Sequence, residues 1–250
     1  MIRIEHEGAV ASIVLDRAES RNAMTAGMMA DIARAVDDIS RDDQVRCLAV
    51  RGEGEHFCAG RDLTQGEDRN LGPAVERYEA WTEVFRRLDR LAIPSVAVVQ
   101  GYAVAGGFTL AMGCDFVIAE RSAQFGVLEM RSGFPAAVNT PLLAQLVGSR
   151  LGLEMLLFGE MIDAARLYEM GLVNRLADGP EELERVATRF IARAAALNPE
   201  GVKLTKALHR AARSMPRDDA LAMGTQLNAL IATSGTFDAA AEKFRKREID

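Results

Sequence analysis

The chain has 250 residues, of which 49% are apolar and 26% charged, a composition typical of a globular protein with a sizeable core. A net charge of −6 argues against a broad nucleic-acid-binding surface, because such a surface favours a basic excess. The three cysteines lack the spacing of metal ligands, and the N-terminal stretch 1–17 is too charged for a signal peptide. We therefore expect a cytoplasmic protein with reduced thiols.

The first half of the chain alternates strands and helices. Residues 2–16 alternate apolar and polar side chains around Gly8, which predicts a β-hairpin. Thr25 is placed to cap a helix with an apolar stripe that runs from Met28 to Ile39. Further strands are predicted over 46–52, 94–101, 115–120 and 123–127, and further helices over about 73–91 and 105–113.

The second half is predominantly helical. Short helices are predicted to start at Thr140, Ser149 and Asp163 and to end at the glycine that follows each of them, Gly148, Gly159 and Gly171. A brief strand is expected over 172–177, followed by longer helices over roughly 180–197, 200–213, 216–233 and 237–248. This order predicts an α/β core over 1–190 and a helical C-terminal region over 191–250, and no repeat is visible in the letters.

An apolar, glycine-rich segment, "GYAVAGGFTLAMGCD" (101–115), follows the predicted strand 94–101. The charge-free run 94–114 is long enough to cross a membrane, but Pro94, Gln100 and four glycines favour a strand, a turn and a buried helix. The segment lacks the lysine of a phosphate-binding P-loop and the spacing of a dinucleotide-binding loop. Its glycines alone are equally compatible with close packing of a helix on a strand.

A second segment, "HFCAGRDL" (56–63), also leaves an apolar strand through Ala-Gly. Two such loops after neighbouring buried strands can direct backbone N–H groups to one point, and the helix near Ala105 adds the positive end of its dipole. Two converging donors in a dry pocket form an oxyanion hole, which stabilises negative charge on a carbonyl oxygen. His56 and Cys58 are not interpreted as a catalytic dyad.

Five segments in chain order resemble the crotonase, or enoyl-CoA hydratase/isomerase, superfamily: "IVLDRAESRNAM" (13–24), "HFCAGRDL" (56–63), "GYAVAGGFTLAMGCDFVIAE" (101–120), "AQFGVLEMRSGFP" (123–135) and "ARLYEMGLVNRL" (165–176). The resemblance spans nearly the whole chain. It implies a crotonase-like spiral of ββα units with a C-terminal helical trimerisation region, and a homotrimer or a hexamer made of two trimers. It also implies an acyl-CoA thioester as substrate, with no metal and no redox cofactor.

The family's site residues carry over by position. The resemblance assigns the two oxyanion donors to the backbone N–H groups of Arg61 and Gly106. An arginine at 61 is unusual for the family, and its side chain is expected to face either solvent or a CoA phosphate. The positions that match the family's CoA and acyl path are Arg17, Ala23, Ala59, Asp62, Leu63, Thr109 and Phe134, with Phe244 and Lys246 of the last helix reaching the CoA of a neighbouring subunit.

The family's hydratases use two glutamates, and this chain has one of them. Thr109 stands at the first glutamate position, three residues after Gly106, and Glu129 stands at the second. Adding water to a conjugated double bond engages both carboxylates. Moving a double bond from the 3,4 to the 2,3 position needs one base, which takes a proton from C2 and returns it at C4. The residues therefore favour isomerisation over hydration.

The surroundings of these side chains leave alternatives open. Glu129 is either an exposed acid beside Arg131 or a partly buried one, in which case its apolar neighbours raise its pKa. The Thr109 hydroxyl is expected to bond to a preceding helix carbonyl. Asn139 or Arg131 is a candidate for the acyl end of the pocket, where it would influence substrate choice.

Three hypotheses follow. The first is a Δ3,Δ2-enoyl-CoA isomerase with Glu129 as the acid/base. The second is an enoyl-CoA hydratase in which Glu129 works alone, and the same single acid also suits C–C bond formation, decarboxylation or thioester hydrolysis. The third, from a different class, is a CoA-binding paralogue without catalytic activity.

Overall fold

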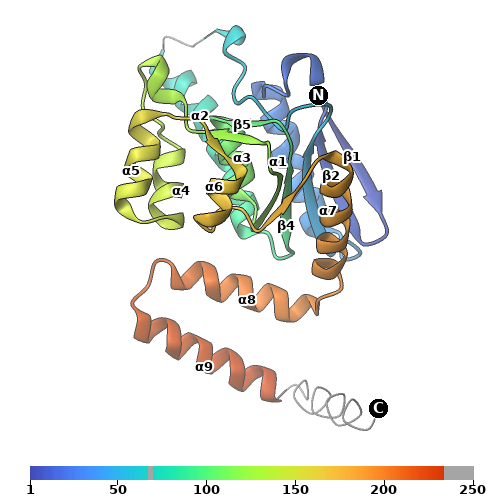
Figure 1. Cartoon of the computed structure of the whole chain (residues 1–250). Coiled ribbons are helices and arrows are strands. Elements are labelled where there is room, and N and C mark those ends of the chain that lie inside the picture. Colours follow the sequence, from blue (N-terminus) through green and yellow to red (C-terminus); the bar gives the residue numbers. More distant parts are fainter. Residues whose placement is uncertain (67–69, 234–250) are drawn as a thin grey trace. The chain divides into compact units, whose positions relative to one another are not determined.

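The structure is a computed structural model that describes residues 1–66 and 70–233 (Figure 1). The chain forms two compact units, the first over Met1–Pro199 and the second from Glu200 onward. The boundary expected near residue 190 falls inside helix α7 (Pro180–Ala195), which packs on the first unit's sheet and so belongs to that unit.

The first unit is organised around a six-stranded sheet in the order β1-β2-β3-β4-β6-β9. Its first two strands form the predicted antiparallel hairpin, in which Gly8 has a φ of +56° that suits glycine. All the other neighbouring strands run parallel. The strands are β1 (Ile2–Glu7), β2 (Val10–Leu15), β3 (Cys47–Gly52), β4 (Ser95–Val99), β6 (Phe116–Glu120) and β9 (Arg175–Ala177).

A second, three-stranded sheet has the order β5-β7-β8, with β5 (Tyr102–Val104) parallel to β7 (Gln124–Gly126) and β8 (Ile162–Asp163) antiparallel to β7. Cys58 extends this sheet through an isolated parallel bridge to Ala103. Three times along the chain, a strand of the large sheet is followed by a short segment of the small sheet and then by a helix. This is the ββα spiral that the resemblance implied.

The helices of the first unit begin largely where the sequence predicts. The Thr25 hydroxyl accepts a hydrogen bond from the Met28 N–H at the start of α1 (Ala26–Arg41), and the Asp163 carboxylate accepts one from the Arg166 N–H at the start of α6 (Ala164–Glu169). The others are α2 (Leu71–Arg90), α3 (Gly106–Gly113), α4 (Asn139–Leu146) and α5 (Ser149–Phe158), with short 3-10 turns η1 (Ala18–Ser20), η2 (Leu63–Gln65) and η3 (Glu129–Ser132).

Apolar side chains cover both faces of the large sheet. One face packs with α1, α3 and the small sheet in the main core, and the other packs against α7 through Leu183, Ala187 and Ile191. The apolar run 94–114 divides into β4, β5 and the buried helix α3, as its glycines indicated, although β5 was not expected as a separate strand. Among the residues that the structure describes, no helix is long and apolar enough to span a membrane.

The second unit contains α8 (Pro199–Ala212) and α9 (Arg217–Thr233), close to the predicted ranges. A side chain at Gly224 of α9 would lie 3.6 Å from Leu208 of α8, so the two helices are in contact. The helix predicted over 237–248, with Phe244 and Lys246, lies outside the described residues. A role of this region in trimerisation stays a prediction.

Candidate active site

The three predicted catalytic positions follow three adjacent segments of the small sheet. Arg61 comes after Cys58, Gly106 after β5 and Glu129 after β7. These segments run parallel, with Cys58 paired to Ala103 and Val104 paired to Gly126. Because the carboxyl ends of parallel strands meet at one edge of a sheet, the fold brings the three positions together.

The two predicted oxyanion donors lie on peptides that touch. Gly60 has a φ of +95°, and a Cβ on it would lie 3.0 Å from the Val104 carbonyl oxygen and 3.4 Å from the Gly106 nitrogen. Met24 donates to the Gly60 carbonyl at 2.7 Å and accepts from the Asp62 N–H at 2.9 Å. This parallel pattern turns the Arg61 N–H away from Met24.

The start of α3 presents the second donor. Gly106 is the first residue of the helix, so its N–H has no acceptor within the helix. Ala105 before it has a φ of +49°, which is uncommon for a residue with a side chain and marks local strain. The Ala105 N–H is held by the Gly126 carbonyl at 2.8 Å, which fixes the direction in which the helix begins.

The glycines of this helix are also required for packing. A Cβ on Gly107 would overlap the carbonyl oxygen of Cys58, and one on Gly106 would lie 2.6 Å from the ring of Trp81. Close packing and an oxyanion hole were alternatives at the sequence level. The structure shows the close packing, which brings the two loops together, and the oxyanion hole stays a prediction that this packing is compatible with.

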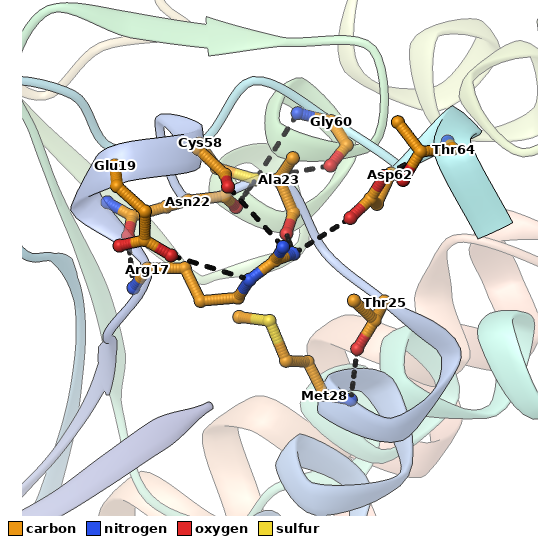
Figure 2. A network of polar contacts seen from close by, with 11 residues as sticks. Arg17, Glu19, Asn22, Ala23, Thr25, Met28, Cys58, Gly60, Asp62 and Thr64 are labelled. Carbon is orange, nitrogen blue, oxygen red and sulfur yellow. Dashed lines mark hydrogen bonds and ion pairs between the residues drawn. The ribbon is translucent and has the colours of Figure 1, made fainter.

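A network of polar contacts supports the Arg61 loop from the side (Figure 2). The Arg17 guanidinium donates to the Ala23 carbonyl at 2.6 Å and to the Asp62 carboxylate at 3.0 Å. The fully buried Asn22 accepts from the Arg17 N–H and donates to the carbonyls of Glu53 and His56. These bonds connect the loop 17–25 to the loop 53–62.

Two ionisable groups in this network have shifted pKa values. The Thr64 hydroxyl and N–H hold the pKa of Asp62 below its usual range, with a smaller contribution from Arg17. Burial raises the pKa of the Cys58 thiol to about 12, so this thiol is neutral at physiological pH and unsuited to nucleophilic attack. His56 stacks on Tyr102 instead of facing Cys58, which agrees with the absence of a dyad expected from the sequence.

Glu129 is half-buried at the start of η3. Its Oε1 accepts a hydrogen bond of 2.9 Å from the Asn139 amide, whereas its buried Oε2 has no hydrogen-bond partner among the described residues. Desolvation raises the pKa of Glu129, and the Asn139 bond only partly opposes this. Within the same part of the chain Glu129 forms no ion pair, and Arg131 is exposed, so the partly buried alternative holds.

Thr109 and Asn139 lie behind Glu129. Thr109 is 2% exposed, and its hydroxyl lies within bonding distance of two acceptors, the expected preceding carbonyl of Ala105 at 3.2 Å and Asn139 Oδ1 at 2.9 Å. Its single proton serves one of them at a time, and Asn139 Oδ1 is the nearer. Asn139 is 0% exposed and contacts Glu129, so it stands behind the acid and does not line an open acyl pocket.

A pocket of about 80 Å³ lies between α1, α2 and the loop after Arg61, and Trp81 connects it to the start of α3. Of the predicted substrate-binding residues, Asp62 lines this pocket, together with the predicted donor residue Arg61. Leu63 and Phe134 are exposed, and the Ala59 N–H donates to the Arg21 carbonyl. The Arg61 guanidinium donates to the exposed Tyr78 hydroxyl at 2.8 Å and lies 5.3 Å from that ring, and its orientation toward a CoA phosphate stays a prediction.

The sequence did not reveal the part that three residues play in the site. Trp81 lies within the helix predicted over about 73–91 and was given no role in the site, yet its ring borders both the pocket and Gly106. Asn22 and Asn139 are fully buried amides, and a buried amide is costly unless it is bonded. A polar residue inside an apolar stretch was the available signal, but its partners follow only from the fold.

Known proteins with similar sequences and structures show the family of this chain. Residues 5–245 match the family model described as enoyl-CoA hydratase/isomerase. A protein of Thermus thermophilus named putative enoyl-CoA hydratase is 34% identical, over 94% of this chain and 93% of its own length. The 1,2-epoxyphenylacetyl-CoA isomerase of Escherichia coli is 34% identical over 72% of each chain.

A crystal structure of an enoyl-CoA hydratase from Mycobacterium smegmatis superposes with a TM-score of 0.92 and 26% identity, over 98% of this chain and 96% of the other. The match covers both the sheets and the loops that carry the candidate site. The chain has the crotonase fold and belongs to the enoyl-CoA hydratase/isomerase family of acyl-CoA enzymes.

Proposed function

We propose that this protein is an enoyl-CoA isomerase that shifts the double bond of a 3-enoyl-CoA to the 2,3 position. The observation that carries the proposal is the contrast between Glu129 and Thr109. Glu129 is a half-buried acid with one oxygen unpartnered among the described residues, while Thr109 is locked between Ala105 and Asn139. A hydroxyl held in this way cannot replace the second glutamate of a hydratase.

The proposed reaction uses one acid and two backbone donors. The Glu129 carboxylate takes a proton from C2 of the bound thioester and becomes a carboxylic acid. The C2 electrons move into the thioester carbonyl, and the N–H groups of Arg61 and Gly106 stabilise the oxygen that gains negative charge. Glu129 then returns the same proton to C4 as the double bond forms between C2 and C3. The raised pKa of Glu129 supports this role, because an acid/base works best with a pKa near the working pH.

The proposed substrate is a coenzyme A thioester, and the proposed reaction needs no metal or redox cofactor. Every step is a proton transfer or a charge stabilisation that the chain's own groups can supply. We place the CoA along Arg17, Ala23, Ala59, Asp62 and Leu63, where the loops 17–25 and 53–62 are joined by the network of Figure 2.

We also propose a homotrimer or a dimer of trimers in the cytoplasm. Several large apolar side chains on α4 and α5 are exposed in the single chain, which supports association: Leu146, Leu153, Leu157 and Phe158. The burial of all three cysteines is compatible with a reducing compartment. Light scattering after size-exclusion chromatography would report the mass of the assembly.

Hydration is the second candidate, and the relatives favour it, since the Thermus thermophilus protein is named a putative enoyl-CoA hydratase. In that reaction Glu129 would work alone on water and substrate. The two candidates are separated by assaying 3-enoyl-CoA and 2-enoyl-CoA substrates with the wild type, Glu129→Gln and Thr109→Glu. We expect the wild type to isomerise faster than it hydrates, and Thr109→Glu to gain hydration. Faster hydration by the wild type would favour the second candidate, and CoA binding without turnover of either substrate would favour an inactive paralogue.

A further inference from the structure

One buried amide connects the acid to the oxyanion peptide. Asn139 Nδ2 donates to Glu129 Oε1 at 2.9 Å and to the Ala105 carbonyl at 3.4 Å, while its Oδ1 lies 2.9 Å from the Thr109 hydroxyl. The orientation of the amide follows from these partners, because the Ala105 carbonyl can only accept and the Thr109 hydroxyl has a proton to give. Both hydrogens and the oxygen of the amide are therefore used.

We propose that Asn139 is a positioning residue that holds Glu129 by Oε1 and so makes Oε2 the oxygen that takes and returns the substrate proton. This inference rests on the proposed function of Glu129 as the acid/base. When a carboxylate is fixed through one oxygen, its other oxygen keeps a defined direction. Oε2 is buried without a partner among the described residues, so its basic lone pairs remain available to a substrate carbon.

The same amide acts on the oxyanion side of the site. The Ala105 carbonyl and the Gly106 N–H belong to one peptide group, so donors to that carbonyl polarise the N–H. The carbonyl accepts from the Thr109 N–H at 3.1 Å and from the Asn139 amide at 3.4 Å. Asn139 therefore orients the acid and strengthens the donor that stabilises the product of proton removal.

The charged groups around Glu129 leave Asn139 as its main polar contact. Neither α3 nor α4 contains a titratable side chain in its sequence. The neighbouring helix α5 contributes Arg150 and Glu154, and η3 itself contributes Arg131, all three of which are exposed. Apart from desolvation, the pKa of Glu129 depends on its own backbone N–H and on Asn139.

The test compares Asn139→Leu with Thr140→Val. Leucine has a similar volume to asparagine but no polar atom. Thr140 is the next residue of α4, and its exposed hydroxyl bonds only to the Ala136 carbonyl among the described contacts, so its removal is a matched control. Both full-length variants are measured by isomerase kinetics over a range of pH and by ¹³C NMR titration of glutamate carboxyl groups, with Glu129→Gln assigning the Glu129 signal.

We expect Asn139→Leu to lower kcat by up to about 100-fold with a smaller change in KM, since misplacing a catalytic group by about 1 Å has an effect of that size. The acidic limb of the kcat profile and the carboxyl titration of Glu129 should both move to higher pH, because Oε1 loses its donor. Thr140→Val should leave both unchanged. A fall in kcat with an unmoved titration would overturn the proposal, because a merely structural role predicts that result.

The NMR titration also separates this inference from the proposed function. If the wild type turns over no enoyl-CoA but the Glu129 titration moves in Asn139→Leu, the isomerase proposal fails and the hold of Asn139 on Glu129 stands. If the wild type is active and the Glu129 titration does not move in Asn139→Leu, the positioning role of Asn139 is refuted while the isomerase proposal stands. Should Asn139→Leu not fold, Thr109→Val replaces it, since it keeps the amide and removes the group that fixes Oδ1. In Thr109→Val we then expect a smaller shift of the Glu129 titration to higher pH, and in Thr109→Ser a return to the wild-type titration. An unmoved titration in Thr109→Val would overturn the inference.

Discussion

The candidate site has two halves of different construction. The proposed oxyanion half consists of backbone N–H groups at Arg61 and Gly106, in loops packed closely through glycines and next to the strained Ala105. The acid half consists of side chains, in which Glu129 is bonded to Asn139 and Asn139 to Thr109. The first half tolerates a change of side chain at the donor residue, while the second depends on the identity of each group. In such a fold the backbone half would be shared among related enzymes, and the side-chain half would select the reaction.

The strongest test of the side-chain half is Glu129→Gln. The amide preserves the shape of the side chain but cannot accept a proton, so kcat should fall by about 10²–10⁴-fold, the usual contribution of a placed acid/base. Binding of an acyl-CoA, measured by calorimetry, should remain, because the backbone donors are untouched. Unchanged turnover would mean that the chemistry does not depend on this half.

The backbone half is tested by Gly107→Ala against Gly113→Ala, at opposite ends of α3. A methyl group on Gly107 would overlap the Cys58 carbonyl and lie 2.8 Å from the Cys58 Cβ, whereas one on Gly113 would meet Phe85 at an ordinary 3.5 Å. We expect Gly107→Ala to lower the free energy of unfolding by about 1–3 kcal/mol, as overpacking does, and to reduce kcat. Gly113→Ala should match or exceed the wild type in denaturant titration. Equal stability of both variants would refute the close-approach argument.

The sequence predicts the backbone half better than the side-chain half, for a physical reason. Glycines, caps and strand patterns act locally, so the hairpin at Gly8 and the helix start at Thr25 are confirmed as predicted. The resemblance pointed to Gly106 and Glu129 by their position in matching segments. The bond between Glu129 and Asn139 joins residues on either side of a turn, and no local pattern specifies it.

The ββα repeat of the fold also could not be predicted from local sequence patterns. The elements that define it in the small sheet are very short: Cys58 is a single bridge, and β5 and β7 have three residues each. Segments of this length carry too little alternation to be separated from the loops around them. The repeat is therefore visible in the pairing of the strands and not in the amino-acid sequence.

A milder test of the backbone half is Arg61→Ala. Because the proposed donor is the N–H and not the guanidinium, kcat should change by no more than a few-fold, while KM rises if the side chain's position on Tyr78 shapes the pocket. Steady-state kinetics with the preferred enoyl-CoA gives both values. A loss of kcat approaching the 10²–10³-fold expected for a lost oxyanion donor would show that the guanidinium itself takes part.

The smallest expected effect concerns stability and pH in the side-chain half. The pKa of Glu129 is higher in the folded protein than in the unfolded chain, because burial disfavours its charge. As the pH rises from the unfolded pKa to the folded one, the unfolded chain loses its proton first, so the wild type loses stability across this window and levels off above it. The Gln variant has no such proton, and its different hydrogen bonding adds only a constant offset. Thermal unfolding of both proteins from acid to neutral pH should therefore show the wild type falling relative to Glu129→Gln, and parallel curves would show that the acid is not held in a desolvated setting.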